Sequence, residues 1–148
     1  MPDPNLMPQG IVDAQFSIPF TVAATLVNRR LSLEEFNDAN LHNETILALA
    51  GRVTPILDRE LDKGPLDVKP QIVEIVMRNG ECLRQRIDYP KGNPKNPVTS
   101  AELLQSFRVM AGYAARPMTH AKIDEAIDFI LQLETKENAA MMTRFLVA

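Results

Sequence analysis

The stretch QIVEIVMRNGECLRQRIDY, residues 71–89, decides the fold class of this 148-residue chain. Two runs that mix apolar and polar residues flank Arg78-Asn79-Gly80. Asn-Gly between two such runs predicts an antiparallel β-hairpin, because tight hairpin turns need residues that tolerate positive φ angles. The sequence therefore contains at least one small antiparallel sheet.

The register of this hairpin follows from which residues share a face. A two-residue loop would put arginines on the apolar face of the first strand. A three-residue loop, with Gly80 left-handed in a bulge, pairs Met77 with Glu81. It also places Glu74 opposite Arg84, a cross-strand pair worth about 0.2–1 kcal/mol. We predict this register, which gathers these apolar side chains on one face: Val73, Ile75, Met77, Leu83 and Ile87.

Helices are expected on both sides of the hairpin. Residues 13–28 are apolar all around a helical axis, which predicts a buried helix with Ser17 as its N-cap and Pro19 in its first turn. Ser32 and Glu35 fit a capping box that opens a short helix. The other expected elements are a helix at 44–52, a strand at 53–57, and helices at 101–112, from Thr119 onward and at 135–148.

The chain divides near Pro97, and the whole is predicted to be α+β: a small antiparallel sheet with helices, followed by C-terminal helices. We predict an extended N-terminal segment over residues 1–12, an α+β portion over 13–97, and a C-terminal helical segment over 98–148. The helices after Pro97 carry more apolar surface than they can cover among themselves. We therefore expect a homodimer or a higher oligomer.

Composition excludes several classes of function. The net charge of −3 leaves no basic surface for nucleic acid or a membrane. A single cysteine, Cys82, excludes an intrachain disulfide and a cysteine-based zinc site. The longest uncharged run, residues 14–28, has 15 residues, whereas a membrane span needs about 20. The first nine residues contain no Lys or Arg, unlike a secretory signal, so we expect a cytoplasmic protein.

Two segments could bind a ligand, although no nucleophile–base pair or metal-ligand spacing stands out. AQFSIPF, residues 14–20, leads into the buried helix, and a helix N-terminus suits a carboxylate. KGNPK, residues 91–95, places two lysines on a stiff backbone, which suits an anionic ligand or a partner domain. Simple helix capping and a rigid connector are the alternative interpretations of these segments.

These two segments, in this order, resemble the MmgE/PrpD family, which includes 2-methylcitrate dehydratase, cis-aconitate decarboxylase and iminodisuccinate epimerase. DAQFSIPF at 13–20 is similar to the family's AQFS-x-P-Tyr run before an alanine-rich helix. PKGNP at 90–94 with NP at 96–97 is close to the family's PKG(D)P-x-NP. Residues 31–36, residues 46–53 and the Asn79-Gly80 turn extend the resemblance over nearly the whole chain.

The resemblance implies a two-domain enzyme in which a large helical domain comes first, an α+β lid follows, and the last helices return to the helical domain. This sequence looks like the later part of the lid with the returning helices. Most family members work without metal or other cofactor. They act on di- and tricarboxylic acids by removing a proton beside a carboxylate, and cations and helix N-termini would hold such substrates.

The resemblance also implies which residues would contact substrate. On the lid side they are Gln15, Phe16, Ser17, Phe20, Lys91 and Gly92. The catalytic residues stay unknown, because most belong to the helical domain, which we expect to be missing from this chain. The sequence departs from the family in having Phe20 for a tyrosine, Arg29 for a helix-ending glycine and Asn93 for an aspartate. A left-handed arginine would cost about 1 kcal/mol.

Two functions are compatible with these observations. The chain is either part of a lyase or isomerase that acts on a small polycarboxylate, or a non-catalytic remnant that serves as a dimerising structural or interaction module. In the first case a helical domain or a separate helical polypeptide completes the active site, and the chain is inactive alone. In the second case no such polypeptide exists.

Overall fold

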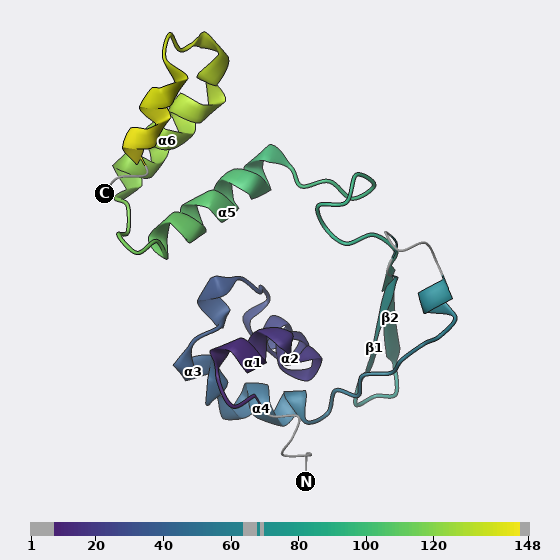
Figure 1. Cartoon of the computed structure of the whole chain (residues 1–148). Coiled ribbons are helices and arrows are strands. Elements are labelled where there is room, and N and C mark those ends of the chain that lie inside the picture. Colours follow the sequence, from purple (N-terminus) through teal and green to yellow (C-terminus); the bar gives the residue numbers. More distant parts are fainter. Residues whose placement is uncertain (1–7, 64–67, 69, 146–148) are drawn as a thin grey trace. The chain divides into compact units, whose positions relative to one another are not determined.

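The computed structural model describes residues 8–63, 68 and 70–145, and the chain forms two compact units, Met1–Asp58 and Arg59–Ala148 (Figure 1). The α+β class is confirmed: a small antiparallel sheet stands among helices and is followed by C-terminal helices. No described helix is both long and apolar enough to cross a membrane. The division into an α+β portion at 13–97 and a helical segment at 98–148 stays a prediction.

The first unit packs helices around one core. Its elements are α1 (Ile11–Phe16), α2 (Ile18–Asn28), the 3-10 turn η2 (Leu33–Glu35), α3 (Asp38–Leu41) and α4 (Glu44–Ala50). Small residues on α2 let α4 pack closely against it. The buried core residues are Ala14, Phe20, Ala23, Ala24, Ile46 and Ala50.

Ser17 separates α1 from α2: the helix predicted to begin after Ser17 is α2, and residues 13–16 of the apolar stretch belong to α1. The backbone of Ser17 is extended, and its Oγ accepts a hydrogen bond of 3.3 Å from the backbone N–H of Phe20. The predicted N-cap and the place of Pro19 in the first turn are confirmed. The break arises because an N-cap residue has non-helical dihedral angles. Residues 11 and 12, expected in an extended segment, form the first turn of α1 instead.

The hairpin of the second unit has the predicted register. β1 (Gln71–Val76) pairs antiparallel with β2 (Cys82–Ile87). The backbone N–H of Met77 donates to the carbonyl of Glu81 over 2.7 Å, and Gly80 has a φ of 85°. Glu74 and Arg84 form an ion pair of 3.2 Å, so the three-residue loop is confirmed.

The apolar face of this hairpin does not form a core. Val73, Met77, Leu83 and Ile87 are exposed to solvent. A strand was expected at 53–57, but the structure has none at these residues. Among the described residues the sheet consists of β1 and β2. Pro55 lacks a backbone N–H donor for strand pairing, and the exposed side chain of Ile56 gains no burial that would stabilise a strand here.

The C-terminal part holds α5 (Ser100–Gly112) and α6 (His120–Leu131), with Thr99 and Thr119 as their N-caps. A helix was expected at 135–148, but the chain forms the 3-10 turns η4 (Leu133–Thr135) and η5 (Ala139–Phe145), and residues 146–148 lie outside the described residues. Asn138 Oδ1 accepts from the backbone N–H of Ala140 over 3.0 Å, a local bond that competes with an α-helix. The buried residues are Ala111, Ile123, Ala126, Ile127, Phe129 and Phe145.

Candidate functional site

The predicted residues of the AQFSIPF segment lie at different depths. Gln15 is exposed, and the Phe16 side chain is 84% exposed at the end of α1. Phe20 is 1% exposed, and its ring lies 6.4 Å from that of Phe36 in the core. Half-buried Ser17 stands between them as the N-cap. Gln15 and Phe16 are therefore available to a partner or ligand, whereas Phe20 is part of the core.

The proline-rich loop, residues 90–97, is closed by its own hydrogen bonds. The backbone N–H of Gly92 donates to the carbonyl of Asn96 over 2.9 Å, and the Asn96 side-chain amide donates to the carbonyl of Tyr89 over 2.9 Å. Asn93 Oδ1 accepts from the backbone N–H of Lys95 over 2.9 Å. Gly92 has a φ of 95°, which a side chain would strain. The loop thus presents its two lysines from a fixed backbone.

The two lysines of this loop have different partners. Lys91 Nζ lies 2.9 Å from Glu102 Oε1 in the first turn of α5. Lys95 Nζ donates to the Tyr89 hydroxyl over 2.8 Å and lies 4.7 Å from the centre of that ring. Sequence spacing did not reveal either contact, because each joins residues that only the folded loop brings together.

Glu102 is both a helix cap and the partner of Lys91. Its Oε2 accepts from the backbone N–H and the hydroxyl of Thr99, both over 2.8 Å. The hydrogen bond from the Thr99 backbone contributes most, and with the bonds from Lys91 and the Thr99 hydroxyl it lowers the pKa of Glu102 from 4.5 to about 2. Glu102 is therefore a carboxylate at neutral pH.

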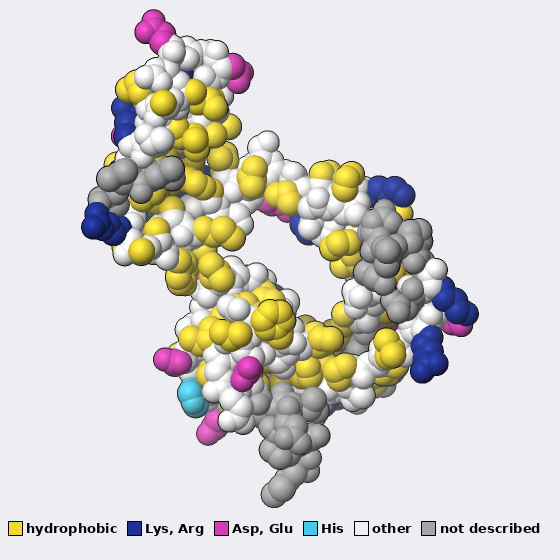
Figure 2. Space-filling view, in the orientation of Figure 1, with side chains coloured by type: hydrophobic (Ala, Val, Ile, Leu, Met, Phe, Trp, Pro, Cys, Tyr) yellow, Lys and Arg dark blue, Asp and Glu magenta, His cyan; other side chains and the backbone are white. Residues whose placement is uncertain are grey.

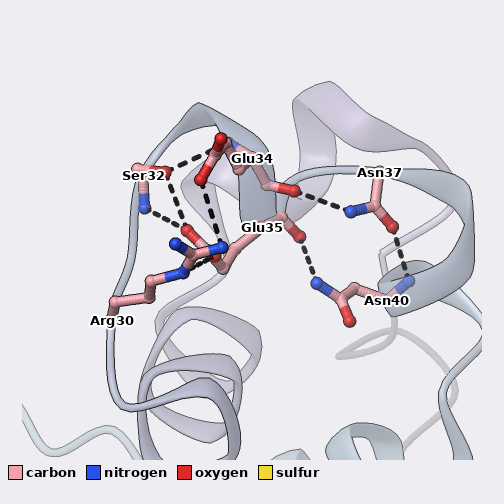
Figure 3. Close-up of polar contacts among 6 residues, drawn as sticks. All are labelled: Arg30, Ser32, Glu34, Glu35, Asn37 and Asn40. Atoms are coloured by element: carbon pink, nitrogen blue, oxygen red, sulfur yellow. Dashed lines mark hydrogen bonds and ion pairs between the residues drawn. The ribbon is translucent and has the colours of Figure 1, made fainter. Parts of the chain in front are cut away.

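A second polar cluster joins Arg30, Ser32 and Glu35, which follow α2 in the chain (Figure 3). Glu35 accepts from the backbone N–H of Ser32 over 2.7 Å and from its hydroxyl over 2.8 Å, which confirms the predicted capping box. Arg30 Nε lies 2.6 Å from the other carboxylate oxygen of Glu35. The role of Arg30 was not predicted, and its place two residues before the cap was the available signal.

The carboxylate of Glu35 is buried and charged. Burial by itself would raise its pKa, but the two hydrogen bonds from Ser32 and the charge of Arg30 outweigh burial and lower the pKa. The backbone carbonyl of Glu35 also accepts from the side chain of Asn40 over 2.9 Å. These contacts stabilise the segment that connects α2 to α4, so the cluster has a structural role.

A shallow cleft of about 450 Å³ lies beside the hairpin and is poorly suited to a polycarboxylate. Among the described residues that line it, Arg86 is the one cation, and that guanidinium is paired with Asp88 over 2.6 Å. Glu60 adds a second carboxylate to the lining. No group of acidic, histidine or cysteine side chains among the described residues could hold a metal ion.

Comparison with known proteins decides the family. Residues 3–133 match the MmgE/PrpD C-terminal domain. The chain belongs to the MmgE/PrpD family. A search of curated proteins found no significant match. The match of residues 3–133 confirms both the predicted family and the predicted C-terminal portion of it.

The structure places each departure from the MmgE/PrpD pattern. Phe20 fills the core, where a phenyl ring leaves no hydroxyl to satisfy. Arg29 has a φ of 56° and is the C-cap of α2, so it keeps the left-handed conformation that the family's glycine would adopt. Asn93 supplies a side-chain oxygen to the loop, as an aspartate would. The fold of this chain thus accommodates all three residues.

Proposed function

We propose that this chain is the C-terminal part of a MmgE/PrpD-type enzyme, a 2-methylcitrate dehydratase-like lyase or isomerase that acts on a small polycarboxylate. The match of residues 3–133 to the family's C-terminal domain carries the proposal. The chain would contribute substrate-holding groups, and a helical domain or separate polypeptide would contribute the residues that remove the proton. The chain alone would be inactive.

The proline-rich loop is the best candidate for holding a carboxylate. An ammonium group has three N–H donors, and Lys91 uses one on Glu102. The backbone of the loop is fixed, so Lys91 and Gly92 need little ordering when a ligand binds. In the first unit, Gln15, Phe16 and Ser17 stay the proposed substrate contacts.

Exposed apolar side chains favour contact of this chain with another protein. Val12 and Phe16 lie four residues apart on α1, and Leu103 and Met110 lie seven apart on α5, so each pair shares a helix face. Figure 2 shows hydrophobic side chains on the surface of the chain. Such side chains are stabilised when another protein covers them.

The test is reconstitution. The chain is purified from its native host to find whether a helical polypeptide travels with it, and each preparation is assayed for dehydration of 2-methylcitrate. We expect no turnover by the chain alone and turnover by the complex, which Lys91→Ala with Gln15→Ala reduces. Turnover by the isolated chain well above that of this double variant would contradict the proposal.

The alternative is a non-catalytic module that dimerises through its exposed apolar faces, and the exposed Leu103 and Met110 of α5 favour it. It predicts a homodimer that binds no helical polypeptide and no polycarboxylate. Sedimentation at micromolar concentration tests this alternative, because a compact monomer would exclude the dimerising module.

A further inference from the structure

Lys91 is held at both its backbone and its side chain. Its neighbour Gly92 is tied across the loop to Asn96, and its ammonium is tied to Glu102. Both partners of this ion pair are half exposed, at 49% and 50%. A half-exposed ammonium is accessible to a dissolved anion, and a fixed partner reduces the number of orientations that the lysine adopts.

Glu102 is the rigid member of the pair. Its Oε2 is occupied by the two hydrogen bonds from Thr99 in the capping box, which leaves Oε1 to accept from Lys91. The two roles use different oxygens, so the carboxylate holds the lysine without giving up the helix cap. A lysine side chain has many rotamers when it is free, and holding it in one place removes an entropic cost of ligand binding.

We propose that Glu102 is a positioning residue that holds the Lys91 ammonium beside the start of α5, so that its remaining N–H donors meet a carboxylate group of the ligand. This inference rests on the proposed function, in which Lys91 contacts a polycarboxylate. Glu102 itself contacts no substrate. It acts through Lys91 alone.

A competing role for Glu102 has the opposite consequence. If its carboxylate merely occupied Lys91 in place of the ligand, then removing its charge would strengthen ligand binding. Glu102→Gln separates the two roles, because glutamine also completes a capping box but forms no ion pair. Positioning predicts weaker binding in this variant, and competition predicts tighter binding.

The experiment measures binding of tricarballylate, an unreactive tricarboxylate, to the full chain by following the backbone amide NMR signals of residues 91–93, which every variant retains. We expect saturable shifts, a dissociation constant raised about twofold to fivefold by Glu102→Gln, as for an exposed ion pair, and no binding to Lys91→Met. The double variant should match Lys91→Met. Lys63→Met, which removes another exposed lysine paired with a glutamate, should bind normally.

Three results would overturn the inference: unchanged or tighter binding by Glu102→Gln, a further effect of Glu102→Gln in the Lys91→Met background, or no shift of Lys91 with tricarballylate. In the reconstituted enzyme, Glu102→Gln should raise KM and leave kcat unchanged. If the complex proves inactive while the binding pattern holds, only the proposed function fails. If the complex is active and KM is unchanged, only the role of Glu102 fails.

Discussion

Arg30 and Glu35 form an ion pair of 2.6 Å in which the glutamate side chain is 4% exposed and the arginine side chain 65% exposed. The same arginine also reaches Glu34 over 3.1 Å, and that carboxylate is 41% exposed. One guanidinium therefore serves a buried and an exposed acid. Because a buried hydrogen-bonded charge is worth more than an exposed one, the two pairs should differ in energy.

Replacing these two glutamates measures that difference. Glu35→Gln should lower the free energy of unfolding at neutral pH by about 1–3 kcal/mol, because it removes charged hydrogen bonds from a buried position. Glu34→Gln is the matched control and should cost no more than about 0.5 kcal/mol, as for an exposed pair. Urea unfolding followed by circular dichroism measures both. Equal losses would contradict a special role for the buried acid.

The lowered pKa of Glu35 makes the stability of the first unit depend on pH. Its pKa is lower in the folded chain than in the unfolded chain, so its contribution is fully present above 4.5 and is lost as the pH falls through the lowered value. Wild-type protein should lose stability in acid more steeply than Glu35→Gln. Urea unfolding between pH 7 and pH 2 tests this, and parallel curves would argue against it.

Glu102 should titrate at an unusually low pH. Carbon-detected NMR of its carboxyl should give a pKa of about 2 in the wild-type chain. In Lys91→Met the pKa should rise yet stay below 4.5, because the hydrogen bond from the Thr99 backbone, the largest contribution, remains. An ordinary pKa in the wild type would mean that the capping box does not persist in solution.

Two phenylalanines four residues apart provide a direct test of the first core. Phe20→Ala should lower the free energy of unfolding by about 3–5 kcal/mol, because it empties a fully buried position. Phe16→Ala should leave stability within about 0.5 kcal/mol of wild type, because that ring is already in solvent. Thermal unfolding of the two variants measures the difference, and similar losses would place both rings in the core.

The left-handed C-cap of α2 should be improvable. Arg29→Gly relieves a positive φ of 56° and should raise the free energy of unfolding by up to about 1 kcal/mol. Asn28→Gly, one residue earlier in the right-handed helix, is the control and should lower it by about 0.3 kcal/mol, the difference in helix propensity between the two residues. The opposite order of the two variants would show that the arginine side chain stabilises the cap in another way.

The features that were predicted correctly depend on short stretches of sequence. The hairpin register followed from Asn79-Gly80 and from alternating side chains, and the capping residues Ser17, Ser32 and Thr119 act on groups within one turn. Such features are decided by neighbours along the chain, so the sequence alone is sufficient to predict them.

The features that were missed depend on partners elsewhere. Residues 53–57 have the composition of a strand, but a strand forms only beside another strand, and composition does not supply one. The pairing of Lys91 with Glu102 needs the fold of the whole proline-rich loop, and the contact of Arg30 with Glu35 needs the left-handed turn at Arg29. For the candidate site, the sequence supplied Lys91 but not the carboxylate that holds it.

A single residue, Ser17, couples the outside of the first unit to its inside. Phe16 in solvent and Ala14 in the core belong to the same short helix, and the next helix starts immediately after Ser17. A protein that contacts the Phe16 ring would therefore contact the same helix that places Ala14 in the core.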